Sequence, residues 1–201
     1  MSLASPKITC LFFTDPSVPA FLNAPAGRPL AGDLLIECGF QPTLGYVLNF
    51  ETPVNYPGVA GLLGGVDIGS LSHPTESLPA PILLASGTPV SPLAVRSGLG
   101  RLVAPDERLT AITLLVPVSA ARSLGAALAF ADRFAIAWDA SAFPHEELID
   151  FARWLTTEKL VNKGNFAGLH AYSTAPTTPA HYERLAEILA PLGASLVTIS
   201  G

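Results

Sequence analysis

The sequence has few charged residues. Asp, Glu, Lys and Arg make up only 13% of its 201 residues, whereas a soluble domain usually carries about a quarter. No two basic residues are adjacent, and the formal net charge is −5 at pH 7. Nucleic-acid binding requires a basic patch that neutralises phosphates. We therefore expect no nucleic-acid partner.

Long apolar runs and an export signal are also missing. A run such as Ile112–Val118 is far shorter than the ~18 residues needed to span a bilayer. No charged segment followed by an apolar one stands at the start, so no secretory signal is predicted. The two cysteines, Cys10 and Cys38, lie inside apolar runs and are expected to be reduced core thiols. These features predict a cytoplasmic protein with no membrane partner.

Complete catalytic and cofactor motifs are absent from the sequence. It contains no G-x-x-x-x-G-K-[ST], no G-x-S-x-G and no C-x-x-C, which removes the usual signals for a phosphate-binding loop, a serine nucleophile and a redox pair. His145-Glu146 begins like H-E-x-x-H, but Ile149 replaces the second histidine. Residues 98–103 (GLGRLV) lack the third glycine of a dinucleotide loop. The sequence therefore predicts neither a metal nor a cofactor.

The residues that are present are largely apolar. Hydrophobic residues make up 49% of the chain, and a surface with so little charge must include apolar area or small polar residues. Exposed apolar area often marks an interface. We expect part of this surface to be covered by a protein partner or by self-association.

Residues 110–200 alternate between apolar runs and amphipathic helices. The predicted strands are Thr110–Val118, Phe134–Asp139, Ala167–Tyr172 and Ser195–Ser200, and the predicted helices are Ser119–Arg133, Pro144–Lys163 and Thr178–Leu192. Such alternation is typical of βαβ units and a mostly parallel sheet. A β-α-β-α-β-α-β region in an α/β protein is therefore predicted, and an α+β sheet of ferredoxin-like type stays open as the alternative.

The first half of the chain has a different composition. Residues 1–100 hold 13 of the 19 prolines and 12 of the 17 glycines, and short strands are predicted at Lys7–Phe13, Asp33–Cys38, Leu44–Phe50 and Ile82–Ala85. The second and third of these are spaced for a hairpin. We expect one domain, 1–201, in which a β- and loop-rich part (1–105) joins the alternating part (106–201) in one mixed, mostly parallel sheet covered by helices.

Candidate site residues follow from the rule that open parallel sheets bind ligands at the carboxyl ends of their strands. The rule selects Asp139 first, because it ends a buried run beside Trp138 and precedes a loop that leads into a helix. Such a carboxylate suits a general base or a ligand for a hydroxyl group, although it is also typical of an Asx-turn cap. The other strand-end candidates are Asp15, Ser141, Ser173 and Thr174.

Two further candidates lie elsewhere. His170 falls within a predicted strand, where it is either a catalytic acid–base group or a hydrogen-bonded core histidine. Asp67 lies in a glycine-rich segment, residues 57–70, and a carboxylate among apolar residues must be exposed, paired or functional. The segment lacks the cation of a phosphate loop, so a close-packed loop or a flap over the sheet is expected.

Two functions remain open from the sequence. The first is an intracellular, non-catalytic protein that acts through protein–protein interaction or homo-oligomer assembly, as the low charge suggests. The second is a small-molecule enzyme on an α/β scaffold, with Asp139, His170 and Asp15 as catalytic groups and Ser141, Ser173, Thr174 and Asp67 as ligand-binding groups. The α/β architecture favours neither, because it carries many unrelated activities.

Overall fold

The fold is seen in a computed structural model of the chain. The residues it describes are 6–14, 17–23, 28–39, 58–63, 82–83, 109–129, 131–139, 145–158, 166–172 and 196–199, with single positions at 180, 183, 187 and 190.

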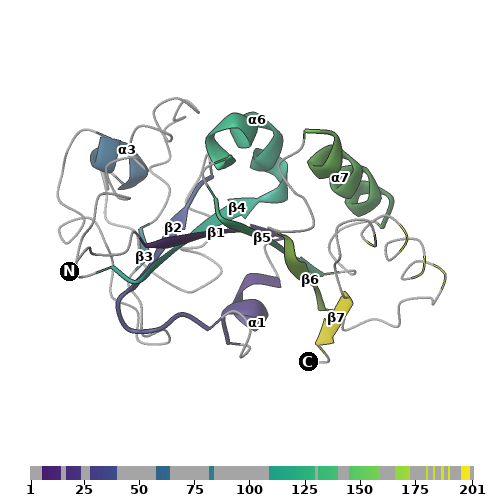
Figure 1. Cartoon of the computed structure of the whole chain (residues 1–201), viewed down its shortest axis with the longest axis horizontal. Coiled ribbons are helices and arrows are strands. Elements are labelled where there is room, and N and C mark those ends of the chain that lie inside the picture. The colour runs from purple at the N-terminus through teal and green to yellow at the C-terminus, as the bar shows by residue number, and fades with distance from the viewer. Residues whose placement is uncertain are drawn as a thin grey trace.

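The described strands form one seven-stranded sheet (Figure 1). They are β1 (Lys7–Phe13), β2 (Asp33–Glu37), β3 (Ile82–Leu83), β4 (Ala111–Pro117), β5 (Arg133–Asp139), β6 (Phe166–Tyr172) and β7 (Leu196–Ile199). Their order is β3-β2-β4-β1-β5-β6-β7, and each pairing between neighbours is parallel. The α/β prediction is therefore confirmed, and the α+β alternative is wrong.

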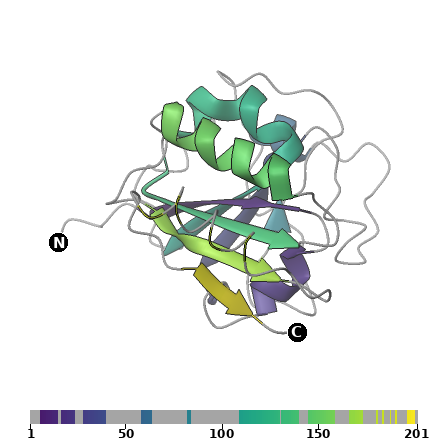
Figure 2. The same ribbon diagram turned by 90° about the vertical axis from the view of Figure 1, so that its right-hand side faces the viewer.

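Helices lie on both faces of this sheet. They are α1 (Ser17–Asn23), α3 (Gly58–Leu63), α6 (Val118–Leu128) and α7 (His145–Thr157). The helices α6 and α7 lie side by side on one face and α1 lies on the other, as two perpendicular views show (Figures 1 and 2). No helix among these described elements is long and apolar enough to cross a membrane.

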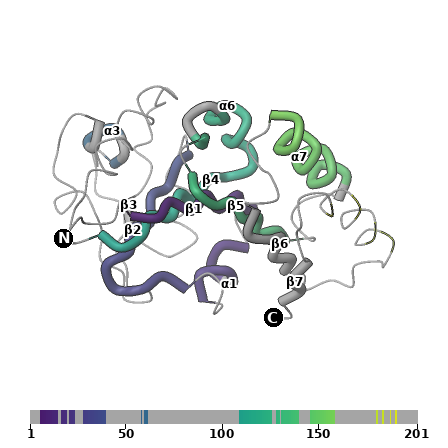
Figure 3. The backbone as a smooth tube through the Cα atoms, in the orientation of Figure 1, coloured from purple at the N-terminus to yellow at the C-terminus, as the bar shows by residue number. Residues whose placement is uncertain are grey.

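The strand β1 occupies the middle of the sheet, between β4 and β5 (Figure 3). Its residues Cys10–Phe13 are buried, as expected for a central strand of a parallel sheet with both faces covered. The chain leaves β1 through α1 on one face, and it leaves β4 through α6 on the other. Neighbouring strands whose connections diverge in this way form a topological switch point, where such sheets bind ligands.

An aromatic cluster joins β1 to α7. The ring of Phe12 lies 5.1 Å from that of Phe151 in an edge-on arrangement and 6.1 Å from that of Phe134 in a stacked one. Phe151 in turn lies 5.5 Å from Trp154. Each such pair contributes about 0.5–1.5 kcal/mol beyond its burial. The cluster fixes α7 over the centre of the sheet.

Two predicted helix ends were wrong. The helix predicted to reach Arg133 ends at Leu128, and Arg133 is the first residue of β5. The helix predicted to reach Lys163 ends at Thr157. The strand β2 pairs in parallel with β3 and β4. Its predicted hairpin partner, residues 44–50, lies outside the described residues.

The glycine-rich segment begins as a helix rather than as the expected loop or flap. Residues 58–63 form α3, and its first residue, Gly58, has a φ of 48°. This left-handed conformation is easily adopted only by glycine. The rest of the segment, including Asp67, lies outside the described residues.

Candidate functional site

The carboxyl edge of the sheet brings together the ends of β1, β4 and β5. Thr14 follows β1, Val118 follows β4 as the first residue of α6, and Asp139 is the last residue of β5. Because the strands are parallel and adjacent, these ends meet at the switch point. Asp139 is half-buried there, at the edge where the sequence placed it.

A chain of hydrogen bonds ties the connection between β1 and α1 to the end of β5. The Asp139 N–H donates to Thr14 Oγ1 at 3.0 Å, and the Thr14 hydroxyl donates to Ser17 Oγ at 3.3 Å. The Ser17 hydroxyl is 2.7 Å from the Thr14 carbonyl oxygen and 2.9 Å from that of Ala137. The Thr14 N–H donates to the same Ala137 carbonyl at 3.2 Å. These polar atoms of Thr14 and Ser17 are therefore used within the protein.

The N-terminus of α1 has little capacity left for an anion. A helix N-terminus binds anions through its unpaired backbone N–H groups. The Ser17 N–H already donates to the Thr14 carbonyl at 2.8 Å, and Pro19, in the first turn, has no N–H. Ser17 is fully buried. At this end of α1 the N–H and the hydroxyl group of Ser17 are therefore bonded within the protein.

A second group of titratable residues is buried at the end of β2. Glu37 and Cys10 are fully buried and Cys38 is nearly so. Burial, with a smaller contribution from the Glu37 carboxylate, raises the pKa of Cys38 to about 12. Burial, and then Cys38, raises the pKa of Cys10 well above its usual value. Both thiols are protonated at neutral pH, which agrees with inert core cysteines because the thiolate is the reactive form.

The other predicted site residues are not assembled around Asp139 by any described contact. His170 lies in β6 opposite Ala137, and Asp139 is opposite Tyr172, so the backbone places His170 two residues before the edge. Outside the described residues lie Asp15, Asp67, Ser141, Ser173 and Thr174. Within the described part of the chain, no group of three or more His, Cys, Asp or Glu residues is placed to hold a metal ion.

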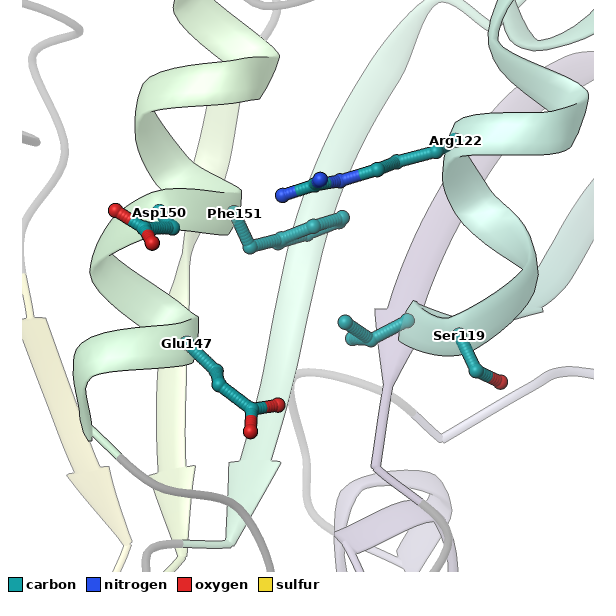
Figure 4. Close-up of a pocket in the computed structure, with 6 residues that line it drawn as sticks. Ser119, Arg122, Glu147, Asp150 and Phe151 are labelled. Carbon is teal, nitrogen blue, oxygen red and sulfur yellow. The ribbon is translucent and has the colours of Figure 1, made fainter.

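A groove between α6 and α7 opens near the same edge of the sheet (Figure 4). Its volume is about 340 Å³, and it is lined by Val118, Ser119, Arg122, Glu147, Asp150 and Phe151. These residues belong to the N-terminal turns of the two helices. The volume is at the lower end of the range for small-molecule sites.

The groove has charges of both signs over an apolar floor. Arg122 extends from α6 over the ring of Phe151 toward α7, and Glu147 points into the space between the helices (Figure 4). Arg122, Glu147 and Asp150 are exposed, while Phe151 is buried. Asp150 pairs with Arg153 at 3.4 Å on the solvent side of α7. Neither Arg122 nor Glu147 has an ion pair or hydrogen bond with another described residue.

Thr14, Ser17, Glu37 and both sides of the groove were not predicted from the sequence. The run Thr14-Asp15-Pro16-Ser17 directly after an apolar strand has the composition of a turn, and this signal could have indicated the two hydroxyl residues. No local signal connects Arg122 to Glu147, because they lie on different helices. Their proximity follows only from how α6 and α7 pack on the sheet.

Comparison with known proteins finds similarity in structure alone. No protein-family model matches the chain, and no curated protein matches it by sequence. Solved structures do match over nearly its whole length. One is a chain of the MinC–MinD cell division protein complex of Aquifex aeolicus: the TM-score is 0.63 at 14% identity, covering 96% of this chain and 81% of that chain.

Two further neighbours were solved with nucleotides. A plasmid partition protein from Borrelia burgdorferi bound to AMPPNP has a TM-score of 0.61 at 17% identity, covering 98% of this chain and 87% of that one. A McdA variant from Cyanothece in complex with ATP has a TM-score of 0.60 at 14% identity, covering 97% and 83%. At these identities the likeness concerns the fold: the chain has the α/β fold of P-loop proteins of the ParA and MinD type.

Proposed function

We propose that this protein acts through protein–protein interaction or homo-oligomer assembly and does not hydrolyse a nucleotide. One structural neighbour belongs to a MinC–MinD protein complex, and the proposal assigns a similar interaction role to this chain. Two other neighbours were solved with bound nucleotides, and the proposal does not extend nucleotide binding to this chain. One observation carries it: the described residues of the connection after the central strand, Thr14 and Ser17, have their hydroxyl groups bonded within the protein.

The connection between β1 and α1 does not fit a nucleotide triphosphate. A P-loop is a strand–G-x-x-x-x-G-K-[ST]–helix unit whose backbone N–H groups and lysine hold the phosphates. Here only Thr14, Asp15 and Pro16 separate β1 from α1. These three residues include no glycine and no cation, and Asp15 adds a negative charge that repels phosphate. We derive no catalytic step through a nucleotide.

The N–H group of Ser17 at the start of α1 does not replace the missing phosphate-binding glycine and lysine residues. Ser17, which begins α1, gives its N–H to Thr14, and its hydroxyl is held between Thr14 and Ala137. The helix has seven residues with a proline in its first turn. A phosphate would have to displace at least two internal hydrogen bonds of a buried residue, each of which contributes about 1 kcal/mol.

The strand β4, one of the two neighbours of β1, also lacks a magnesium ligand, whereas the other neighbour, β5, ends in Asp139. P-loop proteins hold Mg²⁺ with the Ser or Thr of the loop and a strand-borne aspartate. The strand β4 ends in Leu114-Leu115-Val116-Pro117 and is followed by Val118-Ser119, with no carboxylate in this stretch. The hydroxyl of Ser17 is already bonded within the protein.

Composition supports an interaction role for the remaining surface. A chain with 13% charged and 49% hydrophobic residues has few charges with which to cover its surface, and exposed apolar area commonly marks interfaces. The expected cytoplasmic location and the absence of nucleic-acid and membrane partners remain part of this proposal.

The proposal is tested by two measurements on the purified chain. In isothermal titration calorimetry with ATP and Mg²⁺ at millimolar concentrations we expect no heat of binding. Light scattering over a hundredfold range of concentration should show self-association, or a stable complex should form with a protein partner. Saturable ATP binding would overturn the non-catalytic part, and a monomer that captures no protein partner would overturn the interaction part.

A small-molecule enzyme remains the second candidate, because Asp139 is half-buried at the carboxyl end of β5. The register also places His170 two positions before the residue paired with Asp139. A thermal-shift screen of small metabolites tests this alternative. A hit whose stabilisation disappears in Asp139→Asn would support it, whereas a hit that persists in that variant would remove Asp139 from the site.

A further inference from the structure

We propose that the groove between α6 and α7 is a two-fold contact surface for a second copy of this chain, in which Arg122 pairs with Glu147 of the partner subunit. The inference rests on the proposed function and specifies the surface that would carry self-assembly.

The first observation is a pair of opposite charges that share a groove without pairing. Arg122 on α6 and Glu147 on α7 both line the groove, and each is exposed. Among the described residues neither makes an ion pair or a hydrogen bond. Figure 4 shows Arg122 reaching over Phe151 while Glu147 points into the space between the helices. Each charged group is therefore available to an incoming partner.

A two-fold axis along the groove satisfies both charges with a single type of contact. In a symmetric dimer the same patch is used twice, so that a contact of residue i with residue j is repeated as j with i. The cation lies on one helix and the anion on the other. A second copy turned by 180° brings each helix opposite its unlike counterpart. The surface is thus complementary to itself in charge.

Other occupants fit these charges less well. Among the described residues that line the groove, Arg122 is a cation and Glu147 and Asp150 are carboxylates. A phosphate or other free anion is repelled by the carboxylates beside Arg122, and a cation is repelled by Arg122. A second copy supplies both signs at matching positions, and it brings its own apolar floor to cover Val118 and Phe151.

Charge reversal with mixing tests this arrangement. Arg122→Glu places two carboxylates opposite each other at both contacts of the dimer, and Glu147→Arg places two guanidinium groups there. Each variant alone should raise the dimer dissociation constant about tenfold or more, because like charges placed opposite each other disfavour association.

An equimolar mixture of the two variants should restore association as a heterodimer. One contact then joins the carboxylate introduced at position 122 to the guanidinium group introduced at position 147, and the other joins the native Arg122 to the native Glu147. Both contacts are again between opposite charges. The double variant with both changes should dimerise with itself for the same reason.

The measurement is sedimentation equilibrium, with one variant fluorescently labelled for the mixture. Arg133→Glu is the matched control, because it makes the same charge change at an exposed position where β5 begins, at the opposite edge of the sheet. The dimer dissociation constant of Arg133→Glu should equal that of the wild type. At concentrations below the dimer dissociation constant, the unfolding curve of Arg122→Glu should coincide with that of the wild type, because Arg122 is exposed and not bonded to another described residue. Glu147→Arg should unfold slightly earlier but still cooperatively, because it replaces a carboxylate in the first turn of α7.

The outcomes separate this inference from the proposed function. If the wild type dimerises and the single reversals do not weaken it, or the mixture fails to restore it, the α6–α7 surface is wrong while self-assembly stands. If the wild type stays monomeric up to millimolar concentration, the groove is not a dimer surface, and only a different protein partner could sustain the proposed function. The two-fold pairing is supported if the single variants dimerise more weakly and the equimolar mixture regains the wild-type affinity.

Discussion

Two regions at the carboxyl edge of this sheet use their polar groups in opposite ways. At the connection from β1 to α1, the hydroxyl groups of Thr14 and Ser17 bond to each other and to the end of β5. In the α6–α7 groove, Arg122 and Glu147 extend toward solvent and have no bonded partner among the described residues. The first region is internally satisfied, and the second is available for contact.

The difference matters because the fold is shared with nucleotide-bound proteins. The architecture brings the ends of β1, β4 and β5 together, but it does not decide which chemistry occupies that edge. In this chain the buried hydroxyl of Ser17 is bonded within the protein at that edge. Among the described residues, Arg122 and Glu147 on the neighbouring pair of helices are exposed.

The largest effect is expected from Phe151, which joins the groove to the central strand. Its ring forms the floor of the groove and packs 5.1 Å from that of Phe12 on the central strand. Phe151→Ala removes a buried aromatic side chain and should lower the free energy of unfolding by about 3–5 kcal/mol. Urea denaturation followed by circular dichroism measures this. Phe151→Leu should cost clearly less, and an equal loss in both variants would contradict a packing role.

The same substitution in the two regions should have unequal effects. Ser17→Ala leaves the Thr14 hydroxyl without its acceptor at a fully buried position and should destabilise the protein by about 1–3 kcal/mol. Ser119→Ala, at an exposed position of the groove, should stay within about 0.5 kcal/mol. Denaturant midpoints of both variants measure the contrast. Equal midpoints would show that the connection after β1 is not held by Ser17.

Alkaline pH should destabilise the buried group of Glu37, Cys38 and Cys10 at the end of β2. The pKa of Cys38 is raised from 9.0 to about 12 by burial and by Glu37. The folded state therefore keeps the proton longer than the unfolded state, so this stability is complete below pH 9 and is lost as pH rises toward 12. Between these values the wild type should lose about 1.4 kcal/mol per pH unit more than Cys38→Ala. Parallel stability–pH curves for the two proteins would contradict this coupling.

The smallest effect is expected where α6 approaches α7. A Cβ atom at Gly125 would lie 3.5 Å from the ring of Trp154, an ordinary van der Waals contact. Gly125→Ala should therefore stabilise the protein by about 0.5–1 kcal/mol, because glycine is costly within a helix. A rise in thermal midpoint measures it. The larger Gly125→Val should lose this gain, and a loss of stability in Gly125→Ala would mean that the two helices must approach more closely.

The strands of the core were predictable because their signals are local. Lys7–Phe13 was predicted with the bounds of β1, and the runs at 110–118 and 134–139 matched β4 and β5 to within one residue at each end. Continuous apolar runs between turn residues indicate buried strands. Helix ends were predicted less well. Apolar periodicity in the first helix continued past Leu128, where α6 stops, and basic residues up to Lys163 led to a prediction that extends beyond Thr157, where α7 stops.

The candidate site was only partly accessible to the same reasoning. Asp139 was placed correctly at a strand end, because the end of an apolar run is visible in the sequence. The hydrogen bond from its amide to Thr14 Oγ1 joins residues 125 positions apart, and no pattern in either segment predicts it. The central place of β1, which depends on β4 and β5 arriving on both sides of it, was also not predictable from local periodicity.

The sequence by itself determined the alternation of strands and helices, the strands of the central sheet and the lack of a phosphate-binding motif, because each follows from residues adjacent along the chain, whereas the parallel pairing that excludes an α+β sheet came from the structure. The tertiary structure alone decided that Ser17 closes the connection after β1 and that Arg122 and Glu147 share one groove. Those facts depend on the strand order and on the packing of α6 beside α7. Packing between residues that are distant along the chain sets which polar groups meet and which remain exposed. Local sequence patterns do not predict these contacts.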